Sequence, residues 1–247
     1  LGVDVGTALL AIPILLFTAI RQPKRSAQTA STFWQDFRAG FRYIITWRGL
    51  VILLGLVMVI NFFFSATEPL TPLLVTNHFR GNATQLGWWL SSFAAGNVLG
   101  GLILGAWGGF KRKIVTAQFG LILTGLSTVV VGVVPSNLFW VGLAANTAMG
   151  LLLPIINGSF GATLQATIAP DMQGRVFAFI LSAAMLVSPL ALILVGPFAD
   201  AFGIQTWFLI AGISCTLMGL LGFLSSDVMT MENKSSENTP HAAAEPS

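Results

Sequence analysis

The sequence contains seven apolar stretches, each long enough to cross a lipid bilayer as a helix, which takes about 20 mostly apolar residues. They are Leu1–Ile20, Leu50–Val75, Leu86–Trp107, Ile114–Val134, Leu138–Phe160, Val176–Phe198 and Thr206–Leu224. Only 9% of the residues are charged and 55% are hydrophobic, whereas a soluble domain carries roughly 25% charged residues. Such a chain cannot cover a water-facing surface, so we expect an all-α fold whose helices span a membrane several times.

The basic residues predict the orientation of these helices. If the segment between Ile20 and Leu50 lies in the cytoplasm, every Lys and Arg except Arg80 also lies inside, in keeping with the positive-inside bias of membrane proteins. The formal charge of +3 then reflects membrane orientation, and we expect no nucleic-acid partner. The same alternation places the C-terminus in the cytoplasm.

The start of the chain predicts an earlier segment. Leu1 is not a start methionine, Asp4 stands where a signal peptide would carry positive charge, and a basic cluster, Arg21–Arg25, follows the first stretch instead. This helix is expected to enter the membrane from outside, which requires a preceding span. We therefore expect the sequence to be a fragment that lacks its N-terminal part.

Four parts are expected along the chain. Residues 1–20 form the last span of an N-terminal bundle, 21–49 a cytoplasmic linker, 50–224 a bundle of six spans, and 225–247 a disordered cytoplasmic tail rich in Ser, Asn, Glu and Ala.

Within the linker, Thr32–Arg48 predicts an amphipathic helix. Its apolar positions recur at helical spacing: Phe33, Phe37, Phe41, Ile44 and Ile45. We expect this helix to lie on the cytoplasmic membrane surface and to bind anionic lipid. The alternative is a simple cytosolic extension of the next span.

Polar side chains inside the apolar stretches are candidate transport residues, because a polar group is costly in hydrocarbon and tends to be functional there. Asn61, Ser65 and Glu68 follow one another at i, i+4 and i+7, on one face of the second stretch. Pro69 and Pro72 come directly afterwards and predict a bend or break in this helix, because proline lacks a backbone N–H.

The fifth stretch carries a similar stripe of Asn146, Gly150, Pro154 and Asn157. The second and fifth stretches occupy corresponding places in two sets of three spans. Two corresponding spans with polar faces are typical of a transport pathway between inverted repeats. Asn61, Ser65, Asn146 and Asn157 are thus candidates for contact with a substrate, and the alternative is that these side chains link neighbouring helices.

Glu68 is the carboxylate that lies well inside an intact span. It is a candidate for proton coupling or cation binding, because a charge in the bilayer has to be protonated, paired or hydrated. The alternative is that Glu68 lies near enough to the outer surface to reach water or Arg80.

Gly residues four apart in the third stretch predict a close helix–helix contact. The two pairs are Gly96 with Gly100 and Gly101 with Gly105.

The sequence shows no catalytic constellation and no metal-binding pattern. His78 and His241 lack the spacing of metal ligands, and no Gly-rich phosphate loop ends in Lys-Ser/Thr. We therefore expect neither an enzyme nor a bound cofactor or metal.

Four short motifs occur in order along the chain. They are FWQDFRAGFRYI before the second stretch, GAWGGFKRK at Gly105–Lys113, PDMQGRVFA after the fifth stretch, and VGPFADAFG at Val195–Gly203. Together they resemble the major facilitator superfamily of transporters and, within it, the branch of bacterial macrolide-efflux-like drug exporters. GAWGGFKRK resembles a degenerate form of the family's Gly-plus-basic loop, without its usual Asp. The resemblance makes its residues candidates for cytoplasmic gating: Gly105, Gly109, Lys111, Arg112 and Lys113.

The resemblance implies a transporter of twelve spans in two bundles, of which this chain holds the last span of the first bundle, the linker and the second bundle. In that family the first and fourth spans of each bundle line the central cavity, and here these are the second and fifth stretches. It further implies proton-driven export of amphiphilic drugs or similar small molecules through the bacterial cytoplasmic (inner) membrane by alternating access, with Glu68 available for coupling. The implied partners are membrane lipid, a small-molecule substrate, protons and the missing N-terminal half.

Two other functions remain open at this point. One is uptake of a small polar solute. The other is a membrane-integral enzyme or assembly partner that transports nothing.

Overall fold

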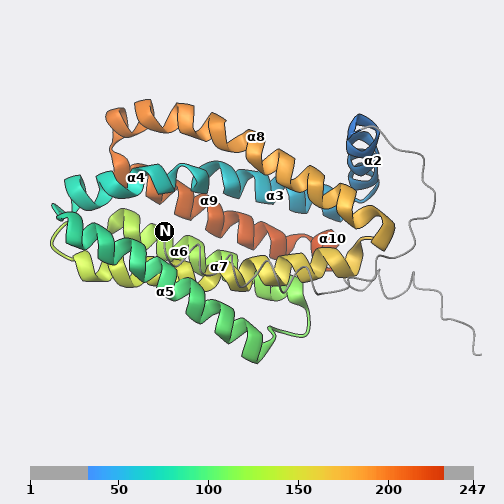
Figure 1. Ribbon diagram of the computed structural model, residues 1–247, viewed down its shortest axis with the longest axis horizontal. Coiled ribbons are helices and arrows are strands. Elements are labelled where there is room, and N and C mark those ends of the chain that lie inside the picture. The colour runs from blue at the N-terminus through green and yellow to red at the C-terminus, as the bar shows by residue number, and fades with distance from the viewer. Residues whose placement is uncertain (1–32, 231–247) are drawn as a thin grey trace, which may run out of the picture. The chain divides into compact units, whose positions relative to one another are not determined.

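The computed structural model describes residues 33–230, and all the regular structure in this range is helical (Figure 1). The first apolar stretch, Thr32 and the chain from residue 231 onward lie outside the described residues. The elements are α2 (Phe33–Thr46), α3 (Arg48–Ser65), α4 (Thr67–Leu73), the π-helix η1 (Leu74–His78), α5 (Ala83–Trp107), α6 (Lys113–Val133), α7 (Phe139–Thr167), α8 (Pro170–Phe202), α9 (Ile204–Leu224) and α10 (Ser226–Met229). Within the described residues, 37–230 belong to one compact unit.

Six segments in the described residues are long and apolar enough to cross a membrane. They are Arg48–His78, Ala83–Trp107, Lys113–Val133, Phe139–Thr167, Met172–Phe202 and Ile204–Leu224. Each coincides with one of the apolar stretches predicted from Leu50 onward, so the all-α membrane fold is confirmed for this part of the chain.

The first of these spans is broken near its middle, as the two prolines predict. α3 ends at Ser65, and α4 begins at Thr67. Pro69 has no N–H to donate to the carbonyl of Ser65, and its ring would collide with that carbonyl in a continuous helix. Hydroxyl groups from either side of the break donate to carbonyls in the last turn of α3: Ser65 Oγ donates to Phe62 O over 3.1 Å, and Thr67 Oγ1 donates to Phe64 O over 2.7 Å.

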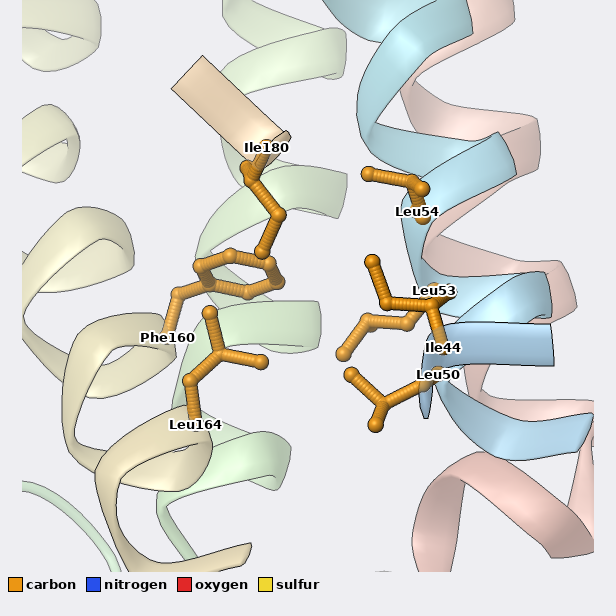
Figure 2. Close-up of a pocket in the computed structure, with 7 residues that line it drawn as sticks. All are labelled: Ile44, Leu50, Leu53, Leu54, Phe160, Leu164 and Ile180. Carbon is orange, nitrogen blue, oxygen red and sulfur yellow. The ribbon is translucent and has the colours of Figure 1, made fainter. Parts of the chain in front are cut away.

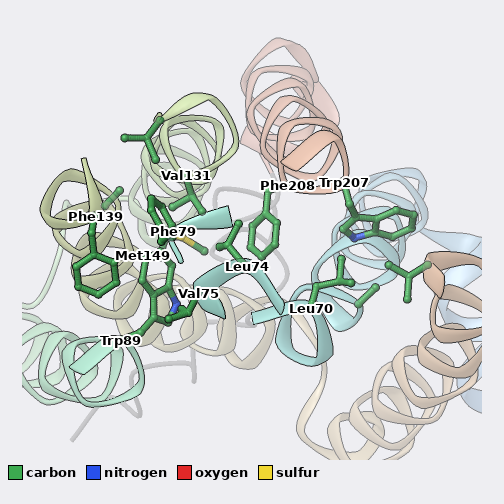
Figure 3. Close-up of a cluster of buried hydrophobic side chains, with 14 of the residues drawn as sticks. Leu70, Leu74, Val75, Phe79, Trp89, Val131, Phe139, Met149, Trp207 and Phe208 are labelled. Atoms are coloured by element: carbon green, nitrogen blue, oxygen red, sulfur yellow. The ribbon is translucent and has the colours of Figure 1, made fainter. Parts of the chain in front are cut away.

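In the bundle, α6 packs against both α7 and α9, α5 packs against α7, and α3 packs against α8 and α9. At the end of the bundle where η1 lies, apolar side chains from several helices form one buried cluster (Figure 3). Leu70, Leu74 and Val75 of the α4–η1 segment face Val131 of α6 and Phe208 of α9 in this cluster. We call this the η1 end, and the opposite end, where α2 lies, the α2 end.

The contact between α5 and α7 is made backbone to backbone. Gly96 and Gly100 are buried, and a Cβ atom added to either would collide with a carbonyl of α7, that of Thr147 or that of Leu151. The predicted close contact at this pair is confirmed. At Gly101 and Gly105 no helix of the described residues makes such a contact, because a Cβ added to either meets no atom within 4 Å.

α2 is a separate helix and not an extension of the next span. Trp47 between α2 and α3 is extended, with φ −113° and ψ 102°, so the alternative of a continuous helix is wrong. Its apolar positions divide between two surroundings: Phe41 and Ile45 are exposed, whereas Ile44 is buried in the bundle at 2% exposure. Ile44 therefore contacts protein and not lipid.

The α2 end of the bundle is closed around Ile44. Ile44, Leu50, Leu53 and Leu54 lie opposite Phe160, Leu164 and Ile180 and leave no room for a water molecule (Figure 2). On the same helix, a Cβ added to Gly40 would lie 2.9 Å from the carbonyl oxygen of Arg175. The second half of α2 is thus seated directly on the start of α8.

Candidate functional site

A cavity of about 290 Å³ lies beside the broken end of the first described span. Its lining comes from five parts of the chain: the α3–α4 break, α5, α6, α7 and α9. The lining residues are Phe64, Thr67, Glu68, Thr71, Trp89, Leu90, Phe93, Thr124, Val131, Asn146, Met149, Leu153 and Phe208. Two of the residues predicted from the sequence, Glu68 and Asn146, are brought together here.

Glu68 provides the carboxylate of this cavity. It lies in the first turn of α4 and is exposed. No salt bridge joins it to a basic residue in the part of the chain that the structure describes, so it does not pair with Arg80. The neighbouring hydroxyls are both engaged with backbone carbonyls: that of Thr67 donates across the break to Phe64 of α3, and that of Thr71 donates to Thr67 within α4. The Glu68 carboxylate is therefore available to a proton or to a ligand.

The opposite wall contributes a hydroxyl group without a partner. Thr124 of α6 is buried at 7% exposure, and its Oγ1 has no hydrogen-bond partner. Thr128, one turn further on, shows the usual arrangement, because its Oγ1 donates to the carbonyl of Thr124 over 2.8 Å. Buried hydroxyl groups in proteins are nearly always hydrogen-bonded. The packing of the helices therefore does not account for the unpaired hydroxyl of Thr124.

Aromatic rings form much of the rest of the lining. Phe64, Trp89, Phe93 and Phe208 approach the cavity from α3, α5 and α9. Trp89 is held by further rings, since its centroid lies 5.6 Å from that of Phe79. Aromatic faces accommodate flat apolar groups, and they also attract cations.

Asn146 has two roles in the structure. It lines the cavity, and its Nδ2 donates to the carbonyl of Trp89 over 2.8 Å and to Ser92 Oγ over 3.0 Å. The side chain thus fastens α7 to α5 while it occupies the cavity wall. The two sequence-based alternatives for Asn146, substrate contact and helix linkage, do not exclude each other.

The other predicted residues lie elsewhere. Asn61 Nδ2 donates to Val57 O and Ser65 Oγ to Phe62 O, so both side chains bond within their own helix. Neither they nor Asn157, which is exposed, line this cavity. The helical face expected to carry Asn61, Ser65 and Glu68 is interrupted at Ala66, because the break lies between Ser65 and Glu68.

Most of the lining was not found from the sequence. Thr67 and Thr71 flank Glu68 and could have been suspected from their position beside the prolines. Thr124, Phe93 and Phe208 carry no local signal, because a threonine or phenylalanine inside an apolar helix is ordinary. Only the packing of the helices brings them to one place.

The loop between α5 and α6 has a clear structural role. Gly108 and Gly109 adopt left-handed φ values of 73° and 79° where α5 ends, and Lys113 Nζ donates to the carbonyl of Gly108. A cation at this position interacts favourably with the negative, C-terminal end of the α5 helix dipole. Lys111 and Arg112 are exposed, and a Cβ added to Gly105 meets open space. The gating role of this loop stays a prediction.

Comparison with known proteins gives consistent results. The Major Facilitator Superfamily profile matches residues 53–246. Macrolide efflux protein A of Streptococcus pyogenes is 27% identical over 238 residues, which make up 95% of this chain and 58% of that protein. Macrolide efflux protein A of Enterococcus faecalis is 28% identical over 196 residues, 78% of this chain and 60% of that protein.

A third relative is the multidrug efflux pump Tap of Mycolicibacterium fortuitum, which is 28% identical over 218 residues, 87% of this chain and 51% of that pump. The chain therefore spans between about half and three fifths of the length of these curated relatives.

Proposed function

This chain belongs to the major facilitator superfamily, whose members are transporters and not enzymes, and we propose that it takes part in exporting amphiphilic small molecules from a bacterial cell. It is a multi-pass membrane protein related to bacterial drug-efflux pumps. The observation that carries the proposal is the cavity that joins the Glu68 carboxylate to aromatic walls. A ligand with a large apolar surface and one polar or cationic group matches this lining.

In the proposed arrangement, residues 50–224 form the second six-span bundle of the transporter, and 1–20 form the last span of the first. Residues 21–49 link the bundles in the cytoplasm, and 225–247 form a cytoplasmic tail. The other bundle would supply the opposite wall of the transport pathway. Lys111, Arg112 and Lys113 would then lie on the cytoplasmic side, where they support orientation and gating.

Export is proposed to be driven by protons through Glu68. A carboxylate that is free of salt bridges can bind a proton and a polar group of the ligand alternately. This exchange would couple movement of the proton in one direction to movement of the ligand in the other. The cavity lies near the η1 end, whereas the α2 end is closed by apolar packing. Alternating access would require the α2 end to open while the η1 end closes.

The direction and driving force can be tested in inverted membrane vesicles containing the protein produced from its whole reading frame. The probe is a radiolabelled macrolide, the compound class in the name of the streptococcal relative. We expect the vesicles to accumulate it when a proton gradient is imposed, and to release it when a protonophore collapses the gradient.

Vesicles from cells without the protein serve as the control. Accumulation only in right-side-out vesicles would support uptake and contradict export. Accumulation that survives the protonophore would contradict proton coupling.

A second prediction concerns the unpartnered hydroxyl of Thr124. If this group serves a ligand, Thr124→Val should weaken binding of the exported compound by about fivefold, the effect of one neutral hydrogen bond. The same change should leave the Tm of the protein equal or higher, because valine removes a buried polar group that has no partner. Binding is measured by equilibrium dialysis in detergent and Tm by differential scanning fluorimetry.

Thr128→Val is the matched control. Thr128 is buried one turn away on α6, does not line the cavity, and donates to the carbonyl of Thr124. It should lower the Tm and leave binding unchanged. Equal binding in the Thr124→Val variant and the parent would show that the hydroxyl takes no part in ligand recognition.

A further inference from the structure

His78 joins three parts of the chain at the η1 end. Its Nε2 lies 2.9 Å from the carbonyl oxygen of Val134, the residue that follows α6. The same Nε2 lies 3.0 Å from Nε2 of Gln205, in the first turn of α9. The imidazole also packs edge-on against the ring of Phe79, with 4.7 Å between the ring centroids.

One nitrogen of a neutral imidazole cannot serve both partners in the same way. If Nε2 carries the hydrogen, it donates to Val134, and Gln205 has to turn its amide oxygen toward the ring. If Nε2 carries none, it accepts from the amide of Gln205 and faces the Val134 carbonyl with a lone pair. A protonated ring always carries this hydrogen and donates it as a charged donor, which makes a stronger hydrogen bond. Protonation therefore selects and strengthens the bond to Val134.

The segment that ends at His78 also carries Glu68. α4 and η1 run without interruption from Thr67 to His78, and the break at Ala66 separates them from α3. Beyond His78, Arg80 adopts a left-handed φ of 53°, which is unfavourable for a residue with a side chain. With a break at one end and an unfavourable turn at the other, this segment is held in place mainly by its side-chain contacts.

We propose that His78 is a positioning residue that fixes the α4–η1 segment, and with it Glu68, against α6 and α9, and that protonation of His78 strengthens its bond to the Val134 carbonyl at the end of α6. The role of Glu68 in this inference rests on the proposed function, whereas the junction itself does not. Imidazole is the side chain that ordinarily changes its charge between about pH 5 and 8.

The surroundings of His78 contain few other charges. Residues 83–93 of α5, 126–142 from α6 to α7, and 204–214 of α9 contain no Asp, Glu, Lys, Arg or His. The charged residues of the adjoining segments are Glu68 on its own segment, Arg80 in the following turn and Asp200 near the end of α8, all of them exposed.

The hold on η1 can be measured by cysteine labelling. Val75 is completely buried in η1, and its neighbour Thr76 is exposed. In a Cys215→Ala background, Val75→Cys reports the opening of η1, and Thr76→Cys reports how an exposed thiol of the same helix reacts at each pH. The measured quantity is the maleimide labelling rate of Val75→Cys divided by that of Thr76→Cys, in membranes containing the full protein.

We expect this ratio to be about fivefold lower at about pH 5.5 than at about pH 8, the difference between a charged and a neutral hydrogen-bond donor. His78→Gln keeps a hydrogen-bonding side chain that does not titrate, and its ratio should be equal at both pH values. His78→Leu should raise the ratio at both. A ratio in the parent that does not change with pH, or the same change in the His78→Gln protein, would overturn the proposal.

Labelling requires neither a substrate nor a proton gradient. It can therefore contradict the role of His78 while export stands, and export can fail while the labelling result stands. If the His78→Leu protein does not reach the membrane, the pH dependence of the His78→Gln protein still decides the question.

Discussion

Replacing Glu68 by glutamine is expected to reduce proton-driven accumulation of the exported compound in inverted vesicles at least tenfold. Glutamine keeps the size and much of the hydrogen bonding of glutamate but can neither take up nor release a proton. Glu68 is exposed and has no salt-bridge partner in the described residues, so the change leaves no buried charge behind. The protein should therefore reach the membrane in normal amounts, as measured by immunoblotting.

Asp200→Asn is the matched control, because Asp200 is another exposed carboxylate of the same bundle that does not line the cavity. It should transport normally, and Glu68→Asp should restore part of the activity by returning a carboxylate. Full drug resistance in cells that carry only the Glu68→Gln protein would remove Glu68 from the mechanism.

Gly100→Ala is expected to destabilise the protein by about 1–3 kcal/mol, the usual cost of forcing extra atoms into a tightly packed contact. A methyl group at this position collides with the carbonyl of Leu151, which is backbone and cannot turn aside as a side chain could. α5 then has to move away from α7, which would also stretch the hydrogen bonds of Asn146 to Trp89 and Ser92. The Tm in detergent should fall by about 5 °C, and ligand binding should weaken with it.

Gly101→Ala, at the next residue, provides a sharp control. A methyl group there meets no atom within 4 Å, and alanine has the higher helix propensity. Its Tm should be equal or slightly higher. Equal Tm values for Gly100→Ala and Gly101→Ala would mean that α5 and α7 lie further apart than described.

Much of the fold follows from local sequence. Runs of apolar residues predict the six described spans, and Pro69 and Pro72 predict the break beside Glu68. Both features depend on residues that are neighbours in the chain. Which glycines make contact is decided by the partner helix, and this is why Gly96 and Gly100 could not be told from Gly101 and Gly105 in advance.

Only part of the candidate site could be predicted from the sequence, for the same reason. Glu68 and Asn146 stand out because an ionisable or amide group is rare in an apolar run, and the structure brings them to one cavity. Asn61 and Ser65 stand out equally, yet their side chains bond to carbonyls of their own helix. The sequence does not distinguish a polar side chain that serves its own helix from one that faces a cavity.

α2 illustrates a similar limit. The spacing of Phe and Ile predicts an amphipathic helix, and a helix is present. The pattern does not say what lies against the apolar face. Ile44 is buried in the bundle, Phe41 is largely exposed although its ring centroid lies 5.5 Å from that of Phe179 in α8, and Ile45 is exposed. Binding of α2 to lipid stays a prediction.

The unequal lengths of the helices bear on how α2 is held. At 1.5 Å per residue, α6 and α9, with 21 residues each, are about 32 Å long, close to the thickness of the hydrocarbon layer. α8 has 33 residues and is about 18 Å longer than α9. The two helices are joined by Gly203 alone at the η1 end, so the excess length of α8 lies at the α2 end.

α2 lies at that end of the bundle (Figure 1), where its residues Gly40 and Ile44 contact the other helices. Helices within lipid gain no hydrophobic driving force from touching one another, whereas apolar groups that would otherwise meet water do. In the proposed topology, in which residues 21–49 lie in the cytoplasm, this part of the core would face water and not hydrocarbon, and the exclusion of Ile44 from water would keep α2 on the bundle.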